Sequence, residues 1–222
     1  MKKILTLSRE LGSGGIAIVQ KLAQRLDWKI IDKEIITRVA EMAECTEGEI
    51  APFDQEEFHR IKMLFKDIAS PTTGGGLMFP FAAGGYMEPY WIPTGVNDPK
   101  IIDESRYLQL TKAVIENLAE KGNVIIVGRG GCVLLKDNPD TLHLRIVCPI
   151  DARIKRLKEV SNIDDAQARQ TLERRDKSSA DYLKYFYHVD WNNPYLYNLT
   201  INTGRRTLND AEQIIYHALM ED

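Results

Sequence analysis

A short apolar run, a glycine-rich turn and an amphipathic helix follow one another at the start of the chain. Residues 4–8 are mostly apolar, and glycines stand at positions 12, 14 and 15. Apolar residues then recur at the spacing of one helical face: Ile18, Val19, Leu22, Ala23 and Leu26. Glycines let successive backbone N–H groups converge, and a helix N-terminus adds partial positive charge. The order therefore predicts a strand, turn and helix that bind an anion through Gly12, Ser13, Gly14 and Gly15.

The turn lacks two groups that a Walker A loop supplies. That loop reads G-x-x-x-x-G-K-[ST], with the lysine on the outer phosphates and the hydroxyl on Mg²⁺. If Gly14 is the second glycine of the motif, Gly15 takes the lysine's place and Ile16 and Ala17 follow. The turn thus keeps the glycines and lacks both the cation and the metal ligand.

Length and composition indicate a single α/β domain over residues 1–222. The net charge of −3 gives no general affinity for nucleic acid or an anionic membrane, so we expect neither as a partner. No apolar run reaches the roughly 20 residues of a membrane helix. The three cysteines form no C-x-x-C pair, which favours a cytoplasmic protein with reduced thiols, and the four histidines lack metal-ligand spacing.

Further strands alternate with helices along the chain. Residues 28–31, 124–127, 142–147 and 199–202 are candidate strands, and residues 103–121, 151–160, 164–175 and 208–219 are candidate helices. This alternation predicts right-handed βαβ units: a three-layer P-loop NTPase-type parallel sheet with helices on both faces. Ligands of such sheets bind beyond the carboxyl ends of the strands, where both glycine turns, 12–15 and 128–131, would lie.

Residues 46–102 form a variable insertion in this pattern. Apolar spacing favours a helix from Pro52 to Ala69, whereas residues 70–99 mix glycines and prolines with aromatic residues and predict irregular structure. Because an exposed aromatic loop would create a large apolar patch, we expect the part from Met78 to Trp91 to be buried. It would cover the mouth of the site or join a second copy in a homo-oligomer through residues 70–99.

Several segments, in this order, resemble the cytidylate kinase-like family of P-loop nucleoside monophosphate kinases. They are Ser8-Arg9-Glu10-Leu11-Gly12-Ser13-Gly14-Gly15, Ile31–Ile36, Val127–Gly130, Leu142–Pro149 with Arg153, Arg175-Asp176 and Asn202–Arg205. The resemblance implies a nucleotide-binding kinase with an ATP site, a monophosphate site and an arginine-rich lid over residues 150–190. The chain departs from the family at Ile16 and Ala17, where the family has an arginine and an acidic residue. It departs again at Gly130, where cytidylate kinases carry an aspartate that helps read cytosine.

Candidate site residues follow from these patterns. Arg9 stands at the first-glycine position of the motif, where it could reach phosphate or pair with Glu10. Asp32 is expected to cap the next helix, and Arg129 directly follows a buried strand, which suits bidentate phosphate binding. The resemblance implies that Arg38 and Lys184 contact substrate and that Arg153 and Arg175 act on the transferring phosphoryl group. We also expect Asp32 to bind substrate and Arg129 to be a catalytic residue. Arg156 and Arg169 are expected to be surface residues.

The predicted activity is transfer of the γ-phosphoryl group of ATP to a nucleoside monophosphate such as CMP or dCMP. Mg²⁺ would be held mainly by nucleotide phosphates and water, because no protein ligands for it are apparent. Two alternatives stay open: a catalytically impaired protein that binds a nucleotide or another phosphorylated small molecule, and a kinase for a non-nucleotide acceptor. The missing lysine favours the first alternative, and the retained arginines favour a kinase.

Overall fold

The structure is a computed structural model that describes residues 1–56, 58, 77–80, 89–92 and 102–221. Its strands are β1 (Ile4–Arg9), β2 (Lys29–Ile31), β3 (Leu77–Pro80), β4 (Pro89–Ile92), β5 (Val124–Val127), β6 (Thr141–Val147) and β7 (Leu199–Asn202). Its α-helices are α1 (Gly15–Leu26), α2 (Glu34–Ala43), α3 (Glu47–Ile50), α5 (Glu104–Lys121), α6 (Gly131–Leu134), α7 (Ile150–Val160), α8 (Asp165–Tyr187) and α9 (Leu208–Met220). Two 3₁₀ turns, η1 (Ala51–Phe53) and η2 (Pro194–Leu196), complete the described elements.

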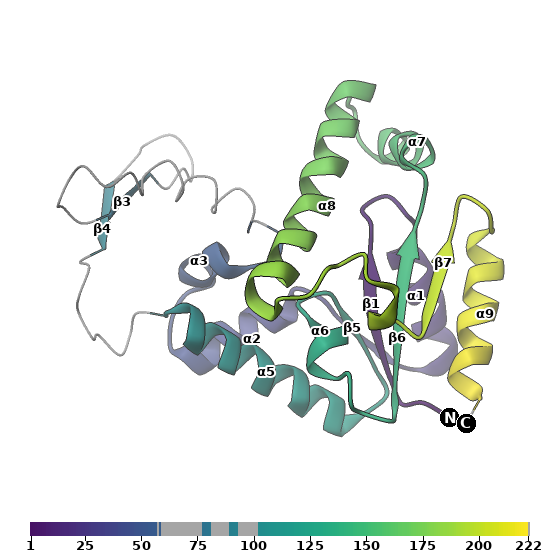
Figure 1. Cartoon of the computed structure of the whole chain (residues 1–222), viewed down its shortest axis with the longest axis horizontal. Helices are drawn as coiled ribbons and strands as arrows, with labels where there is room; N and C mark the ends of the chain where they lie inside the picture. Colours follow the sequence, from purple (N-terminus) through teal and green to yellow (C-terminus); the bar gives the residue numbers. More distant parts are fainter. Residues whose placement is uncertain (57, 59–76, 81–88, 93–101, 222) are drawn as a thin grey trace.

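Five strands form one parallel sheet in the order β2-β5-β1-β6-β7. The predicted parallel α/β sheet is therefore confirmed, with β1 at its centre (Figure 1). Both ends of the chain lie side by side, because the Lys2 N–H donates to the Leu219 carbonyl at 2.8 Å (Figure 1). In the described part of the chain, no helix is long and apolar enough to cross a membrane.

Alternating side chains of the strands pack on helices above and below the sheet. Val124 and Ile126 of β5 join a core with α2, α5 and the end of α8. Ile125 and Val127 point to the other face and pack with α1 and α9. This period-two burial on both faces is what a covered parallel strand requires.

Local signals in the sequence set several helix ends. Asp103 caps α5 by accepting from the Arg106 N–H at 2.7 Å, and Gly122 ends that helix with a φ of 64°. Thr207 and Asp210 form the expected capping box at the start of α9. The helix expected over residues 164–175 is α8, which continues to Tyr187 and so spans 23 residues.

Helices α7 and α8 rise beyond the carboxyl ends of the strands, next to the glycine turn that follows β1 (Figure 1). A buried network ties the segment after α8 back to the sheet. The Trp191 indole donates to Ser8 Oγ at 2.7 Å, and the guanidinium of Arg145 lies 4.2 Å above the Trp191 ring. The segment that follows α8 is therefore fixed at the end of β1.

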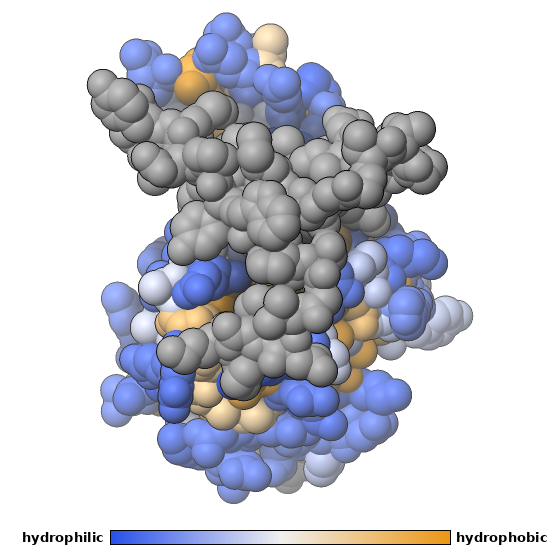
Figure 2. All heavy atoms as spheres, turned by 90° about the vertical axis from the view of Figure 1, so that its left-hand side faces the viewer, coloured by the Kyte–Doolittle hydropathy of each residue, from blue (hydrophilic) through white to orange (hydrophobic). Residues whose placement is uncertain are grey.

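The insertion is described only in part. Strands β3 and β4 pair antiparallel, so the expectation of wholly irregular structure is wrong for these residues. The burial expected for the segment from Met78 to Trp91 lies outside what the structure describes, as does most of the helix expected from Pro52 to Ala69. Figure 2 shows the face of the molecule on this side, where hydrophilic side chains cover most of the described surface.

Candidate functional site

The glycine turn after β1 forms a concave row of backbone N–H groups. Gly12 and Gly14 adopt φ angles of 75° and 84°, and Gly14 precedes the first residue of α1 without a side-chain cap. Among the described residues, no acceptor lies on the N–H groups of Gly14, Gly15 or Ile16. Left-handed glycines that alternate with right-handed residues at a helix N-terminus point such donors at one place, which is the geometry of an anion site.

The Ser13 side chain is fully buried under this turn. Its N–H donates to the Glu10 carbonyl at 3.2 Å, and its carbonyl accepts from Thr203 Oγ1 at 2.6 Å. The hydroxyl has no hydrogen-bond partner within the described ranges. The turn therefore offers its backbone to an anion, and the Ser13 hydroxyl is not on the open side.

A second group of side chains lies next to the turn, where β5 ends. Arg129 Nη1 donates to both the side chain and the carbonyl of Asp32, at 3.0 and 2.9 Å, and its Nε lies 3.2 Å from Asp54. Arg9 approaches the same Asp32 carboxylate at 3.6 Å. Asp32 thus binds two arginines and does not cap α2, whose N-cap is Lys33. The expected cap is wrong because the two guanidinium groups hold this carboxylate in the cleft.

Burial and neighbouring carboxylates shift the pKa values of these two arginines in opposite directions. Burial lowers the pKa of Arg129, but Asp54 and Asp32 outweigh it and the net pKa rises. For Arg9 burial prevails over the attraction of Asp32, and the guanidinium groups of Arg175 and Arg129 add to it, so its pKa falls. Burial is thus the main reason for the lowered pKa of Arg9, and the two neighbouring guanidinium groups contribute less.

Residues 54–56 complete this cleft, and the sequence pattern did not single them out. Gln55 accepts from the Arg129 N–H and donates to Ser179 Oγ at 3.0 Å on α8. Glu56 binds Arg175 of α8, with Oε2 2.9 Å from Nη2. The only sequence signal is a polar Asp-Gln-Glu run directly after Pro52-Phe53, inside a region expected to be helical.

The cleft therefore gathers residues from five separate segments. It is lined by Arg9, Leu11, Asp32, Gln55, Glu56, Val127, Gly128, Arg129, Arg175, Asp176 and Ser179. Arg129 is 2% exposed, yet its Nη2 has no hydrogen-bond partner among the described residues. Because a guanidinium carries five donors, such an arginine can keep Asp32 and still bind a phosphate.

Three other predicted residues lie outside this lining. Arg38 pairs with Glu34 one turn earlier on α2, and Lys184 is exposed on α8. Arg153 is buried and binds Asp176 at 2.7 Å and the Leu11 carbonyl at 3.2 Å. Arg153 thus joins α7 to α8 and to the glycine turn.

Arg156 does not behave as the surface residue that the sequence predicted. Its Nη1 donates to the carbonyl groups of Ser13 and Gly12, at 3.0 and 3.3 Å, on the inner side of the turn. The sequence places Arg156 among acidic residues on a predicted amphipathic helix, and this pattern does not indicate a contact with the turn. Arg169, in contrast, is exposed as expected and pairs with Asp151.

The second glycine turn, after β5, is closed by α8. A Cβ on Gly130 would lie 2.3 Å from the Tyr187 ring, and Gly130 has a φ of 76°. The hydroxyl of Tyr187 donates to the Arg129 carbonyl at 3.4 Å. Position 130 therefore has no room for a side chain while Tyr187 keeps this place.

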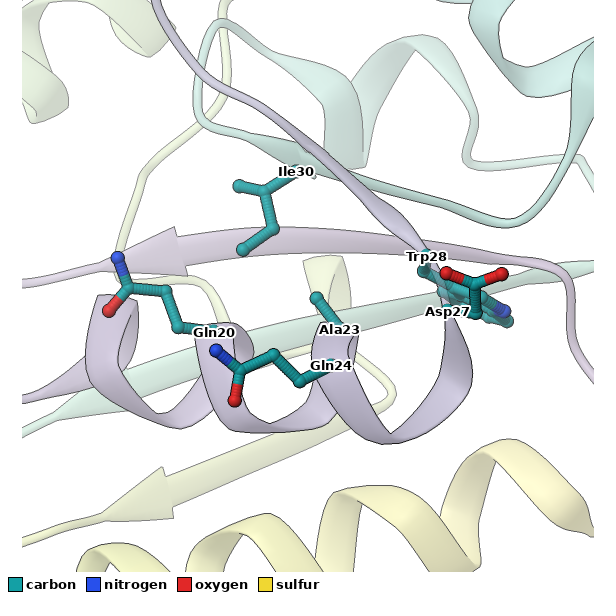
Figure 3. Close-up of a pocket in the computed structure, with 6 residues that line it drawn as sticks. All are labelled: Gln20, Ala23, Gln24, Asp27, Trp28 and Ile30. Carbon is teal, nitrogen blue, oxygen red and sulfur yellow. The ribbon is translucent and has the colours of Figure 1, made fainter.

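A different hollow lies on the surface beside the edge strand β2. Figure 3 shows Gln20, Ala23 and Gln24 of α1 along it, with Asp27, Trp28 and Ile30 at its other side. None of the predicted site residues line it, and none of its lining residues is basic. Within the described residues, no group of three or more histidine, cysteine, aspartate or glutamate side chains is placed to hold a metal ion.

Comparison with known proteins decides the family. Residues 4–205 match the cytidylate kinase-like family. The chain belongs to this family. Membership supports a kinase-like function, and the match includes both glycine turns, the cleft arginines and α7–α8.

Curated relatives match over part of their length. The cytidylate kinase of Methanopyrus kandleri is 28% identical over 46% of this chain and 56% of its own length. That of Methanocaldococcus jannaschii is 27% identical over 52% of this chain and 70% of its own length. A solved structure of an uncharacterized protein from Eubacterium ventriosum has a TM-score of 0.65, 20% identity and coverage of 99% and 98% of the two chains. This last likeness supports the fold.

Proposed function

We propose that this protein transfers the γ-phosphoryl group of ATP to a nucleoside monophosphate, with CMP or dCMP as the acceptor. The observation that carries the proposal is the position of the arginine-lined cleft directly beside the glycine turn. The turn offers the N–H groups of Gly14 and Gly15, which have no acceptor among the described residues, and the cleft offers Arg9, Arg129 and Arg175. Phosphoryl transfer requires two phosphates held close together with their charge neutralised, which this arrangement suits.

The roles divide between the two parts of the site. The backbone of Gly12–Gly15 would hold the donor phosphates. Arg129, fixed by Asp32 and Asp54, would bind the acceptor phosphate through its remaining donors. Arg175 of α8, which forms an ion pair with Glu56, would approach the transferring group when the cleft fills. Mg²⁺ would lie on nucleotide phosphates and water, since the residues at the turn give it no ligand set.

Turnover should be slow for a kinase of this family. Gly15 occupies the place of the Walker lysine, and the arginines of the cleft are already paired with carboxylates. A cation on the transferring phosphates commonly lowers a barrier by several kcal/mol, and each ~1.4 kcal/mol is tenfold in rate. We therefore expect rates orders of magnitude below the typical ~10 per second.

A protein that binds nucleotide without turnover is the second candidate. Gly15, Ile16 and Ala17 favour it, because neither the lysine nor the metal hydroxyl is present. A kinase with another acceptor is the third candidate. The Tyr187 ring on Gly130 favours it, because that contact leaves no side chain at position 130 to recognise a base.

One experiment separates the proposed activity from the two other candidates. The protein is incubated with Mg-ATP and, in turn, CMP, dCMP, UMP, AMP and GMP, and ³¹P NMR detects the diphosphate formed; thermal unfolding with each ligand measures binding. The proposal expects slow, stoichiometric formation of CDP or dCDP. Stabilisation by ATP with no diphosphate from any monophosphate would overturn it in favour of a binding protein or another acceptor. CMP turnover at the rate of an efficient kinase would contradict the account of the missing lysine.

A further inference from the structure

Arg156 reaches the glycine turn from α7, on the side opposite its free N–H groups. Its Nη1 lies 3.0 and 3.3 Å from the carbonyl oxygens of Ser13 and Gly12 and 3.4 Å from Cys148 Sγ, and shares its two hydrogens among its acceptors. The Thr203 hydroxyl lies 3.2 Å from the same Nη1, and Nη2 donates to the Thr203 carbonyl at 3.1 Å. One side chain therefore joins the turn to the ends of β6 and β7.

Arg156 differs from the other arginines around the turn in its partners. Each of the others has a carboxylate within ion-pair distance: Asp32 for Arg9, Asp32 and Asp54 for Arg129, Glu10 and Asp176 for Arg153, and Glu56 for Arg175. Arg156 has only neutral acceptors among the described residues. Its positive charge at the turn is therefore not cancelled by a neighbouring carboxylate.

The contact with the Ser13 carbonyl acts on one of the peptide groups that form the anion site. The carbonyl of Ser13 and the N–H of Gly14 belong to one peptide group, whose two ends point in opposite directions. A cation on the carbonyl polarises that group, so the N–H on the far side becomes a stronger donor. The N–H of Gly14 is one of those without an acceptor in the described structure. Arg156 is thus placed to strengthen the site without entering it.

We infer that Arg156 is a positioning residue that supplies positive charge to the glycine turn on the side of its carbonyl oxygens. A Walker lysine would supply that charge on the side of the phosphates. Arg156 polarises the Ser13–Gly14 peptide group through the Ser13 carbonyl, helps to orient the turn through the Gly12 carbonyl and does not touch the phosphates. The inference rests on the proposed function in one respect, namely that the turn binds the phosphates of a nucleotide. A purely structural role, in which Arg156 only fastens α7 to Thr203, predicts different behaviour.

Two variants separate charge from hydrogen bonding. Arg156→Gln keeps N–H donors and removes the charge, whereas Arg156→Lys keeps the charge and removes the forked geometry. Arg169→Gln on α8 is the matched control, since it removes an exposed arginine of the same helical pair that contacts Asp151 and Glu173. Calorimetric titration with ADP and with inorganic tripolyphosphate, each at two salt concentrations, measures affinity, and urea unfolding measures stability.

We expect Arg156→Gln to weaken binding of both anions by about tenfold or more and to reduce the salt dependence. The affinity of Arg156→Lys for both anions should stay within about threefold of the wild-type value. Arg169→Gln should bind both anions as tightly as the wild type does. An Arg156→Gln variant that loses stability and keeps the wild-type affinity would overturn the inference in favour of a fastening role. A folded Arg156→Lys variant that binds the anions more than about tenfold more weakly would also overturn the inference. The test therefore stays decisive if Arg156→Gln fails to fold.

The outcomes also separate this inference from the proposed function. If the wild type binds tripolyphosphate and not ADP, the nucleotide in the proposed function is wrong, and the Arg156 variants are still decided on tripolyphosphate. If the wild type binds both and the variants bind equally well, the role of Arg156 is wrong and the proposed function stands. If the wild type binds neither anion, both are overturned.

Discussion

At the scale of single residues, the site consists of arginines that carboxylates and carbonyls hold in place. Arg129 is nearly inaccessible and fixed by Asp32 and Asp54, and Arg175 is fixed by Glu56. Sequence reasoning selected Arg9, Arg129 and Arg175 because each belongs to a recognisable motif, and the structure places all three in one cleft. It missed Asp54, Gln55 and Glu56, because the partners of an arginine are brought to it by tertiary folding and leave no spacing in the sequence.

The ion pair between Glu56 and Arg175 should make stability depend on pH. Burial raises the pKa of Glu56, but Arg175 outweighs it and the net pKa lies below the ordinary value of 4.5. Because the folded-state pKa is lowered, the pair stabilises the fold above about pH 4.5 and stops doing so as pH falls through the folded-state value. Glu56→Gln should therefore lower the free energy of unfolding by about 1 kcal/mol at pH 7, with the difference closing below pH 4.5.

Urea unfolding from pH 3 to 8 measures this difference. Glu173→Gln is the control, because Glu173 is exposed and lies 3.9 Å from Arg169 on the same helix, where a pair contributes little. A constant gap between Glu56→Gln and the wild type over the whole range would show that the carboxylate charge is not the source of the stabilisation.

At the scale of elements, the glycine turn combines backbone conformation and close packing. Gly14 has a φ of 84°, and a Cβ there would lie 2.7 Å from Leu208 of α9. Gly12 packs on Arg153 of α7 in the same way, with a Cβ at 3.2 Å from the Arg153 Cβ. The sequence predicted the turn and its place between strand and helix. It did not predict that α7 and α9 pack directly on the turn, because those contacts come from residues far away along the chain.

Gly14→Ala should damage both stability and binding. A left-handed conformation costs a residue with a Cβ roughly 1–2 kcal/mol, and the contact with Leu208 adds to this cost. Moving the turn to relieve the strain displaces the N–H groups, so ADP affinity should fall as well. Gly48→Ala is the control, since the nearest atom to its Cβ would be Thr46 Oγ1 at 3.7 Å and it lies in α3.

Thermal unfolding and ADP titration of both variants measure these effects. We expect Gly48→Ala to be neutral or slightly stabilising, because alanine is the better helix former. Equal stability and equal ADP affinity for Gly14→Ala and the wild type would mean that the turn does not need its left-handed conformation.

At the scale of the whole molecule, the parallel sheet brings distant segments to one edge. Strands β1 and β5 are neighbours, so the turns after them meet although about 115 residues separate them. Strand alternation and apolar runs were enough to predict this sheet. They could not predict the length of α8, whose second half packs on Gly130 and Phe58, because its continuation is decided by tertiary contacts.

The central claim is that the turn from Gly12 to Gly15 binds the phosphates of ATP through its backbone, and one measurement tests it directly. Amide resonances of the ¹⁵N-labelled protein are followed by NMR during titration with ATP. We predict downfield amide proton shifts at Gly14, Gly15 and Ile16, the groups without an acceptor in the described structure, that saturate together with the binding isotherm. Saturable ATP binding that leaves these three resonances unchanged, and shifts those around the hollow of Gln20, Trp28 and Ile30 instead, would contradict the account.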